Sequence, residues 1–159
     1  MKRKTAYLGL FAAVAIIFGY VESLVPVFTG IPGIKLGLAN LAVLFILDRY
    51  SFKEAALVSV VRILVIGFMF GNLFSILYSL AGAALSLDLL KKHSGFSLIG
   101  ISVAGGVTHN IGQLIVAMIV VSNTSLMVYA PALLVAGVLA GIFIGGLTKE
   151  VVGRLPLNL

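Results

Sequence analysis

The sequence predicts an all-α integral membrane protein, a single domain over residues 1–159 with about six transmembrane helices. Hydrophobic residues make up 61% of the chain and charged residues only 10%, and the mean hydropathy is +1.22. A soluble domain of this length needs a polar surface, which this composition does not supply. Apolar runs of the length of membrane helices recur from Thr5 to Leu147 without a linker or a change of composition.

The positions of the basic residues predict how these helices are oriented. Nine of the eleven Lys and Arg residues fall in gaps that share one side of the membrane if each apolar run crosses it. Since basic residues concentrate on the cytoplasmic side, we expect both termini there, in a multi-pass protein of the cytoplasmic membrane. The same charges attract anionic membrane lipid and explain the net charge of +6 without a nucleic-acid partner. The nine are Lys2, Arg3, Lys4, Arg49, Lys53, Lys91, Lys92, Lys149 and Arg154.

Two helices of unequal length are expected in the first third of the chain. The first covers Thr5–Val25 and ends at Pro26; it begins like a signal peptide, but no small-x-small cleavage site follows, so we expect a retained helix. An outer loop rich in proline and glycine follows it. The next helix, Leu36–Leu47, is too short to span the hydrocarbon, so residues 33–37 are expected to dip into the protein and complete the span.

Four further helices complete the predicted bundle. They are expected over Phe52–Phe68, Asn72–Leu90, Leu98–Val121 and Leu126–Leu147, with an outer loop at residues 122–125. Small residues four apart, Gly137, Gly141 and Gly145 in the last helix and Ala15 and Gly19 in the first, indicate faces where helix backbones approach closely. Such a face serves packing within the chain or docking of a separate membrane subunit.

Arg62 is the residue whose position most needs a functional explanation. It lies near the middle of the apolar run Ala55–Phe70, and an arginine at the centre of a membrane helix costs about 2.5–3.5 kcal/mol. Such a charge is tolerated where it faces a partner or a wet cavity. Arg62 is therefore expected to bind a ligand or, alternatively, to pair with Glu22.

Other polar residues in the apolar runs are expected to meet Arg62 at a cavity open to the outer face. Three of them share one face of the Leu98–Val121 helix, and four lie near the outer ends of other helices. Two cations against one carboxylate suit an anionic or carbonyl-bearing ligand. Alternatively, the three polar residues of the one helix only link membrane helices. The predicted substrate-binding residues are Glu22, Lys35, Asn40, Arg62, Asn72, His109, Asn110 and Gln113.

The residues expected for catalysis or metal binding are missing from the sequence. The chain has no cysteine, which excludes thiolate metal sites and cysteine nucleophiles. Its five acidic residues are scattered, whereas Mg²⁺ needs clustered carboxylates, and its two histidines do not make a zinc site. No phosphate-binding Gly-Lys-Ser/Thr loop is present. We expect no catalytic residue, no metal and no cofactor.

Two motifs resemble those of a known family. The stretch Gly30–Asn40 (GIPGIKLGLAN), the helix with Arg62 and the segment Gly106–Gln113 (GVTHNIGQ) are similar to the membrane proteins called heptaprenyl diphosphate synthase component I, or Gx transporter family. The similarity runs over nearly the whole chain. Two-component synthases of this kind keep their Asp-rich catalytic motif on the other, soluble subunit, and the present chain has no such motif.

The resemblance implies a bundle like the substrate-binding S components of energy-coupling factor (ECF) transporters, with six helices, both termini inside and the ligand held toward the outer face. In that class, small residues of the first helix dock a scaffold subunit that couples to two cytoplasmic ATPases; Ala12, Ala15 and Gly19 are the nearest matches here. The implied function is non-enzymatic capture of a small molecule for an ECF-type transporter. The alternatives are a non-catalytic membrane subunit linked to prenyl diphosphate or quinone synthesis, and a scaffold for an electron-transfer complex.

Overall fold

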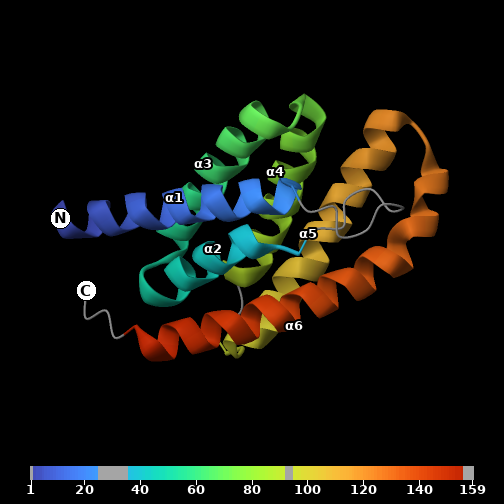
Figure 1. Ribbon diagram of the computed structural model, residues 1–159. Helices are drawn as coiled ribbons and strands as arrows, with labels where there is room; N and C mark the ends of the chain where they lie inside the picture. The colour runs from blue at the N-terminus through green and yellow to red at the C-terminus, as the bar shows by residue number, and fades with distance from the viewer. Residues whose placement is uncertain (1, 25–35, 92–94, 156–159) are drawn as a thin grey trace.

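The computed structural model describes residues 2–24, 36–91 and 95–155, which form six α-helices and one short 3-10 helix (Figure 1). These residues contain no strand, so the all-α class predicted from the sequence is confirmed for them. The helices are α1 (Lys2–Leu24), α2 (Leu38–Arg49), α3 (Phe52–Phe70), α4 (Leu73–Lys91), α5 (Leu98–Val121), the 3-10 helix η1 (Thr124–Tyr129) and α6 (Ala130–Arg154).

Three segments of the described chain are long and apolar enough to cross a membrane. They are Lys4–Leu24, Leu98–Val121 and Thr124–Arg154, and α4 adds a shorter apolar stretch, Leu73–Ser86. Many large apolar side chains are exposed on the outside of the bundle, where a lipid environment would accept them. The structure therefore fits a membrane helical bundle, while the number of crossings and their direction stay predictions.

The last helix differs most from its predicted boundaries. Residues 124–129 form the 3-10 helix η1, and α6 begins at Ala130, with Pro131 in its first turn, where a missing N–H costs nothing. At its other end α6 continues beyond Leu147 to Arg154. The ion pair between Glu150 and Arg154, one helical turn apart, and a basic residue in the last turn both favour this extension.

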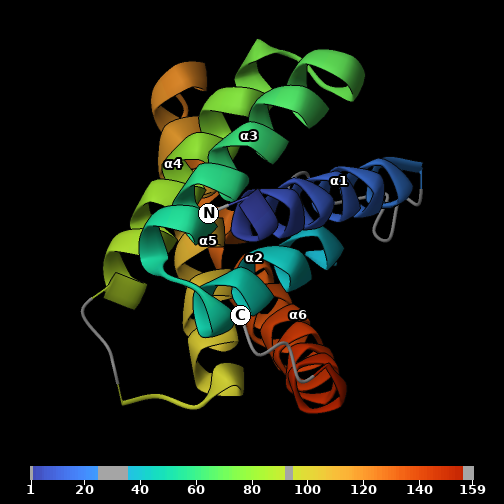
Figure 2. The same cartoon turned by 90° about the vertical axis from the view of Figure 1, so that its left-hand side faces the viewer.

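The short helix α2 lies at the centre of the bundle. It contacts α1, α3, α5 and α6, and the two views show it between α1 on one side and α6 on the other (Figures 1 and 2). Phe45 and Ile46 are fully buried, and buried residues occur around the whole helix, as expected for a core helix. Because α2 is enclosed by protein, it has no need to match the thickness of a bilayer. The dip expected at residues 33–37 falls mostly outside the described residues.

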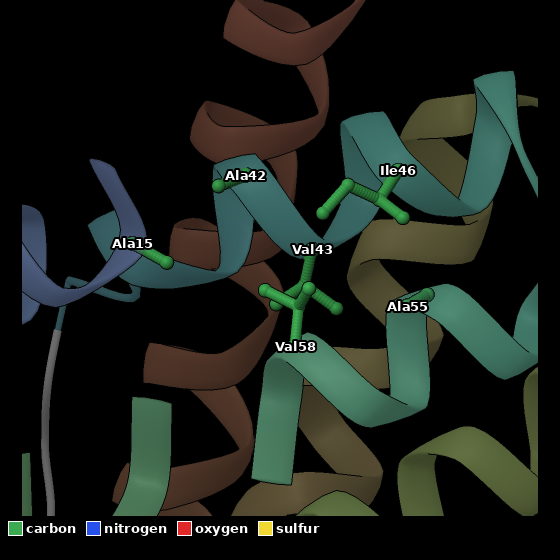
Figure 3. Packing of buried hydrophobic residues seen from close by; sticks show 6 residues of the cluster. All are labelled: Ala15, Ala42, Val43, Ile46, Ala55 and Val58. Carbon is green, nitrogen blue, oxygen red and sulfur yellow. The ribbon is translucent and has the colours of Figure 1, made fainter. Parts of the chain in front are cut away.

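A core of small and branched side chains joins α1, α2 and α3. Ala15 of α1 faces Ala42 of α2, and Val43 of α2 meets Val58 of α3, with Ile46 and Ala55 completing the cluster (Figure 3). Ala15, Ile46 and Ala55 have no exposed surface. The close approach of these three helices therefore depends on the small size of the alanines.

The start of α1 and the end of α6 lie at the same end of the bundle as the connection between α2 and α3 (Figures 1 and 2). Polar contacts join the helices there: Lys4 of α1 forms an ion pair with Glu54 of α3, and Arg49 of α2 donates a hydrogen bond to the backbone oxygen of Val152 in α6. This end carries most of the basic residues and is the predicted cytoplasmic end.

Cysteine labelling tests this orientation, and the absence of native cysteines removes any background. Asn123 follows α5, and Gly153 lies near the far end of α6. We expect Asn123→Cys to react with a membrane-impermeant maleimide in intact cells, and Gly153→Cys to react only after permeabilisation. The opposite pattern would place both termini outside.

Candidate functional site

A cavity of about 130 Å³ lies among the helices and is lined by residues of α1 to α6. It extends from the end of α1 and the start of α2 toward the basic end of the bundle, where Leu47, Ser86 and Ser102 line it. Six of the eight predicted binding residues line this cavity: Glu22, Asn40, Arg62, His109, Asn110 and Gln113. The expected convergence of polar residues from separate helices is therefore present.

The other two predicted binding residues are Lys35 and Asn72. Lys35 lies outside the described residues. Asn72 is exposed and starts α4 instead: its Oδ1 accepts a hydrogen bond from the backbone N–H of Ser75 at 2.8 Å, and Ser75 Oγ accepts one from the Asn72 N–H at 3.0 Å. This reciprocal cap satisfies N–H groups that the first turn of a helix leaves unpaired. An asparagine three residues before a serine is the sequence signal for this structural role.

Glu22 shapes the wall of the cavity where α2 begins. Its carboxylate accepts a hydrogen bond from the backbone N–H of Gly37. Gly37 has a φ of 77°, a left-handed conformation that suits glycine and is costly for residues with a side chain. The contact fixes the start of α2 against α1, with both Leu36 and Gly37 facing the cavity.

Arg62 is oriented by Asn40 rather than by a carboxylate. Its Nη2 donates a hydrogen bond to Asn40 Oδ1, and its Nε is buried without a hydrogen-bond partner among the described residues. Glu22 and Arg62 line the same cavity but form no ion pair, and the Glu22 carboxylate binds the Gly37 N–H instead. The direct Arg62–Glu22 pair, the structural alternative considered for these residues, is therefore not formed.

The polar residues of α5 have different surroundings. His109 packs against α4 at Gly82, where an added Cβ would lie 2.6 Å from the His109 backbone oxygen. Asn110 Nδ2 donates to the backbone oxygen of Leu133 at 2.8 Å and so links α5 to α6, as the structural alternative expects. Gln113 lines the cavity, and its side chain makes no hydrogen bond within the described part of the chain.

Three serines in the cavity wall were not singled out from the sequence. Ser59, Ser86 and Ser102 come from α3, α4 and α5. Ser86 donates to the backbone oxygen of Ala83, whereas the hydroxyls of Ser59 and Ser102 have no partner within residues 2–24, 36–91 and 95–155. Serine is common in membrane helices, where its hydroxyl bonds the preceding turn, so only the cavity distinguishes these from structural serines.

The small residues expected to dock a scaffold subunit lie against the chain's own helices. Ala15 is fully buried in the core of α1, α2 and α3, and Ala12 packs against the same cluster (Figure 3). A Cβ on Gly19 would overlap the Ile66 side chain. The intramolecular alternative accounts for the packing of all three residues, and docking of a scaffold subunit at this face stays a prediction.

The cavity shows no arrangement of metal ligands. The residues that the structure describes contain no group of three or more His, Cys, Asp or Glu side chains placed to hold a metal ion. What the arrangement offers is a partly buried cation, amides and hydroxyls around a small, partly open cavity, which suits noncovalent binding.

Comparison with known proteins gives one match. The family model described as heptaprenyl diphosphate synthase component I matches residues 11–151, a region that contains every residue lining the cavity. No curated protein and no solved structure gives a significant match to this chain.

Proposed function

The chain belongs to the heptaprenyl diphosphate synthase component I family, and we propose that it is a membrane subunit that captures a small polar molecule in the cavity among its helices. The observation that carries this proposal is the gathering of unsatisfied polar groups. Arg62 Nε, the Gln113 amide and the hydroxyls of Ser59 and Ser102 have no hydrogen-bond partner in the described chain, yet all four residues line one cavity.

The free energies favour a bound polar molecule over a purely structural arrangement. A buried polar group left unpaired costs roughly 1–3 kcal/mol, which applies to Arg62 Nε, and the Gln113 amide and the two serine hydroxyls at the same cavity have no partner in the described chain either. A polar ligand, with the few waters that accompany it, satisfies these groups together. The same groups would be an unexplained cost in a scaffold without a ligand.

The volume of the cavity limits the size of the ligand. An engineered cavity of about 150 Å³ holds one benzene molecule, so the cavity here, about 130 Å³, suits a compact molecule. A heptaprenyl chain is many times larger and does not fit inside. Capture of a small molecule from the outer face, in the manner of the S components that the sequence resembles, is therefore the function that the geometry supports best.

Mass spectrometry of the protein purified from its native membrane tests this proposal. Wild-type protein should carry a compact polar molecule. The Ser79→Leu side chain fills the cavity from α4, so the amount of bound molecule should fall at least tenfold in this variant. Ala13→Leu makes a matched addition of bulk on the exposed face of α1 and should retain the molecule. Wild-type protein without such a molecule, or equal occupancy in Ser79→Leu, would contradict the proposal.

The family description favours a second candidate, a non-catalytic membrane component of prenyl diphosphate synthesis. In that role, the chain would hold a soluble catalytic subunit at the membrane, and the cavity would accept at most a headgroup. Affinity purification from native membranes separates the two candidates. If a membrane scaffold with ATPases co-purifies with the chain, the result supports transport. If a soluble prenyl synthase subunit co-purifies, the result supports the synthase role.

A further inference from the structure

The strongest unexplained feature of the cavity is a guanidinium that forms no ion pair among the described residues. Among the described residues, no carboxylate lies within 4 Å of the Arg62 guanidinium, whose one hydrogen bond goes to the neutral Asn40. Lys4, Arg49 and Arg154, at the basic end of the bundle, each have a carboxylate within this distance. Arg62 differs from them because it lines the cavity and has no carboxylate within this distance in the described chain.

An unpaired guanidinium at this depth is costly, and an anion is the partner that best offsets the cost. Burying a charge away from water costs several kcal/mol unless a counter-ion and hydrogen bonds compensate it. Arg62 keeps Nε and further N–H groups available, and a guanidinium can donate two parallel hydrogen bonds to one carboxylate. Asn40 holds the guanidinium in place and so lowers the ordering cost of binding.

The start of α2 lies at the same cavity and already carries one carboxylate, that of Glu22. The Glu22 carboxylate accepts a hydrogen bond from the Gly37 N–H there, and Gly37 also lines the cavity. A helix N-terminus carries a partial positive charge that favours anions. Glu22 lines the same cavity and has the opposite effect, which disfavours a ligand with two negative charges.

We infer that the molecule captured in this cavity is a small monocarboxylate, with its carboxylate bound by Arg62 beside the start of α2. The uncharged remainder of the ligand lies toward Ser59 and Ser102 on the basic side of Arg62. This inference rests on the proposed capture function and goes beyond it by naming the chemical class of the ligand.

Matched acids and amides test the charge requirement without knowledge of the natural ligand. Butyrate and butyramide, and benzoate and benzamide, are close in size and differ in charge. With full-length protein in lipid nanodiscs, calorimetric titration should show at least one acid binding tenfold or more tighter than its amide. A tenfold step corresponds to about 1.4 kcal/mol. Inorganic phosphate, which is largely a dianion above neutral pH, should bind more weakly than that acid.

Two variants assign the preference to Arg62. Arg62→Gln should bind acid and amide equally, whereas Arg154→Gln, which removes an exposed charge, should keep the wild-type preference. Asn40→Asp places a carboxylate beside the guanidinium, so it should raise the melting temperature and abolish the preference for the acid. This variant keeps the test valid if Arg62→Gln does not fold.

Several results would overturn the assignment. These are equal binding of acids and amides, no binding of either acid, tighter binding of phosphate, or a preference that persists in Arg62→Gln or Asn40→Asp. A neutral molecule identified in wild-type protein and lost in Ser79→Leu would also overturn it, while leaving the proposed capture function intact.

Discussion

Replacing Gly141 by leucine is expected to force α5 and α6 apart and to cause the largest loss of stability of any change considered for this chain. An added Cβ at Gly141 would lie 2.5 Å from the Val103 Cα, 2.8 Å from the Val103 N and 2.9 Å from the Ser102 backbone oxygen. These are backbone atoms, so no side-chain rotation relieves the overlap. Overpacking costs typically about 1–3 kcal/mol, and we expect a loss of about 3 kcal/mol or more here.

Gly146, five residues along the same helix, provides the matched control. A Cβ there has no atom within 4 Å, so Gly146→Leu should unfold within a few degrees of wild type. Because the chain has no cysteine for thiol dyes, thermal unfolding is followed by circular dichroism at the helix band. Equal melting temperatures for the two variants would show that the α5–α6 seam is not packed through Gly141.

The same seam connects the stability of the fold to the cavity. Gly106 of α5 and Gly137 and Gly141 of α6 line the cavity and also bring the two backbones together. A side chain at any of these positions changes both the helix spacing and the cavity wall. We therefore expect ligand binding to fall with stability in Gly141→Leu and to persist in Gly146→Leu.

Much of the fold follows from patterns that act over a few residues. Helix α5 begins at Leu98 and ends at Val121, as the sequence predicts. Ser97 caps its first turn, and a polar segment follows its last. The predicted start of the last helix, Leu126, was wrong because residues 124–129 form a 3-10 helix, which has no distinct apolar periodicity. The central position of α2 depends on tertiary packing, and its short length was the only feature of the sequence that distinguished it from the other helices.

The candidate site was predictable where a residue is expensive in an apolar helix. Arg62, His109 and Gln113 were selected on this ground, and the structure places all three at one cavity. The serines were missed because a hydroxyl costs little in a helix. Asn72 does not line the cavity, because an asparagine near a helix start can serve as a cap, a role that its residue type alone does not distinguish from ligand binding.

Replacing Ala15 by leucine distinguishes packing within the chain from docking of a partner. Ala15 has no exposed surface and lies among side chains of α2 and α3, where Figure 3 shows it directed toward Ala42. Leucine adds three carbon atoms at this place, and we expect a loss of about 1–3 kcal/mol in the free energy of unfolding of the isolated protein. Circular dichroism melting of the purified chain measures this loss without any partner present.

Ala13→Leu makes the same addition on the exposed face of α1, and it controls for the effect of added bulk alone. Internal packing predicts a lower melting temperature for Ala15→Leu alone, with any loss of a partner secondary to unfolding. Docking through Ala15 predicts the reverse, an unchanged melting temperature for the isolated chain and a weaker complex with a scaffold subunit in pull-downs. Because leucine on the lipid side costs little, a loss of partner in Ala13→Leu with full stability would instead place the docking surface on the exposed face of α1.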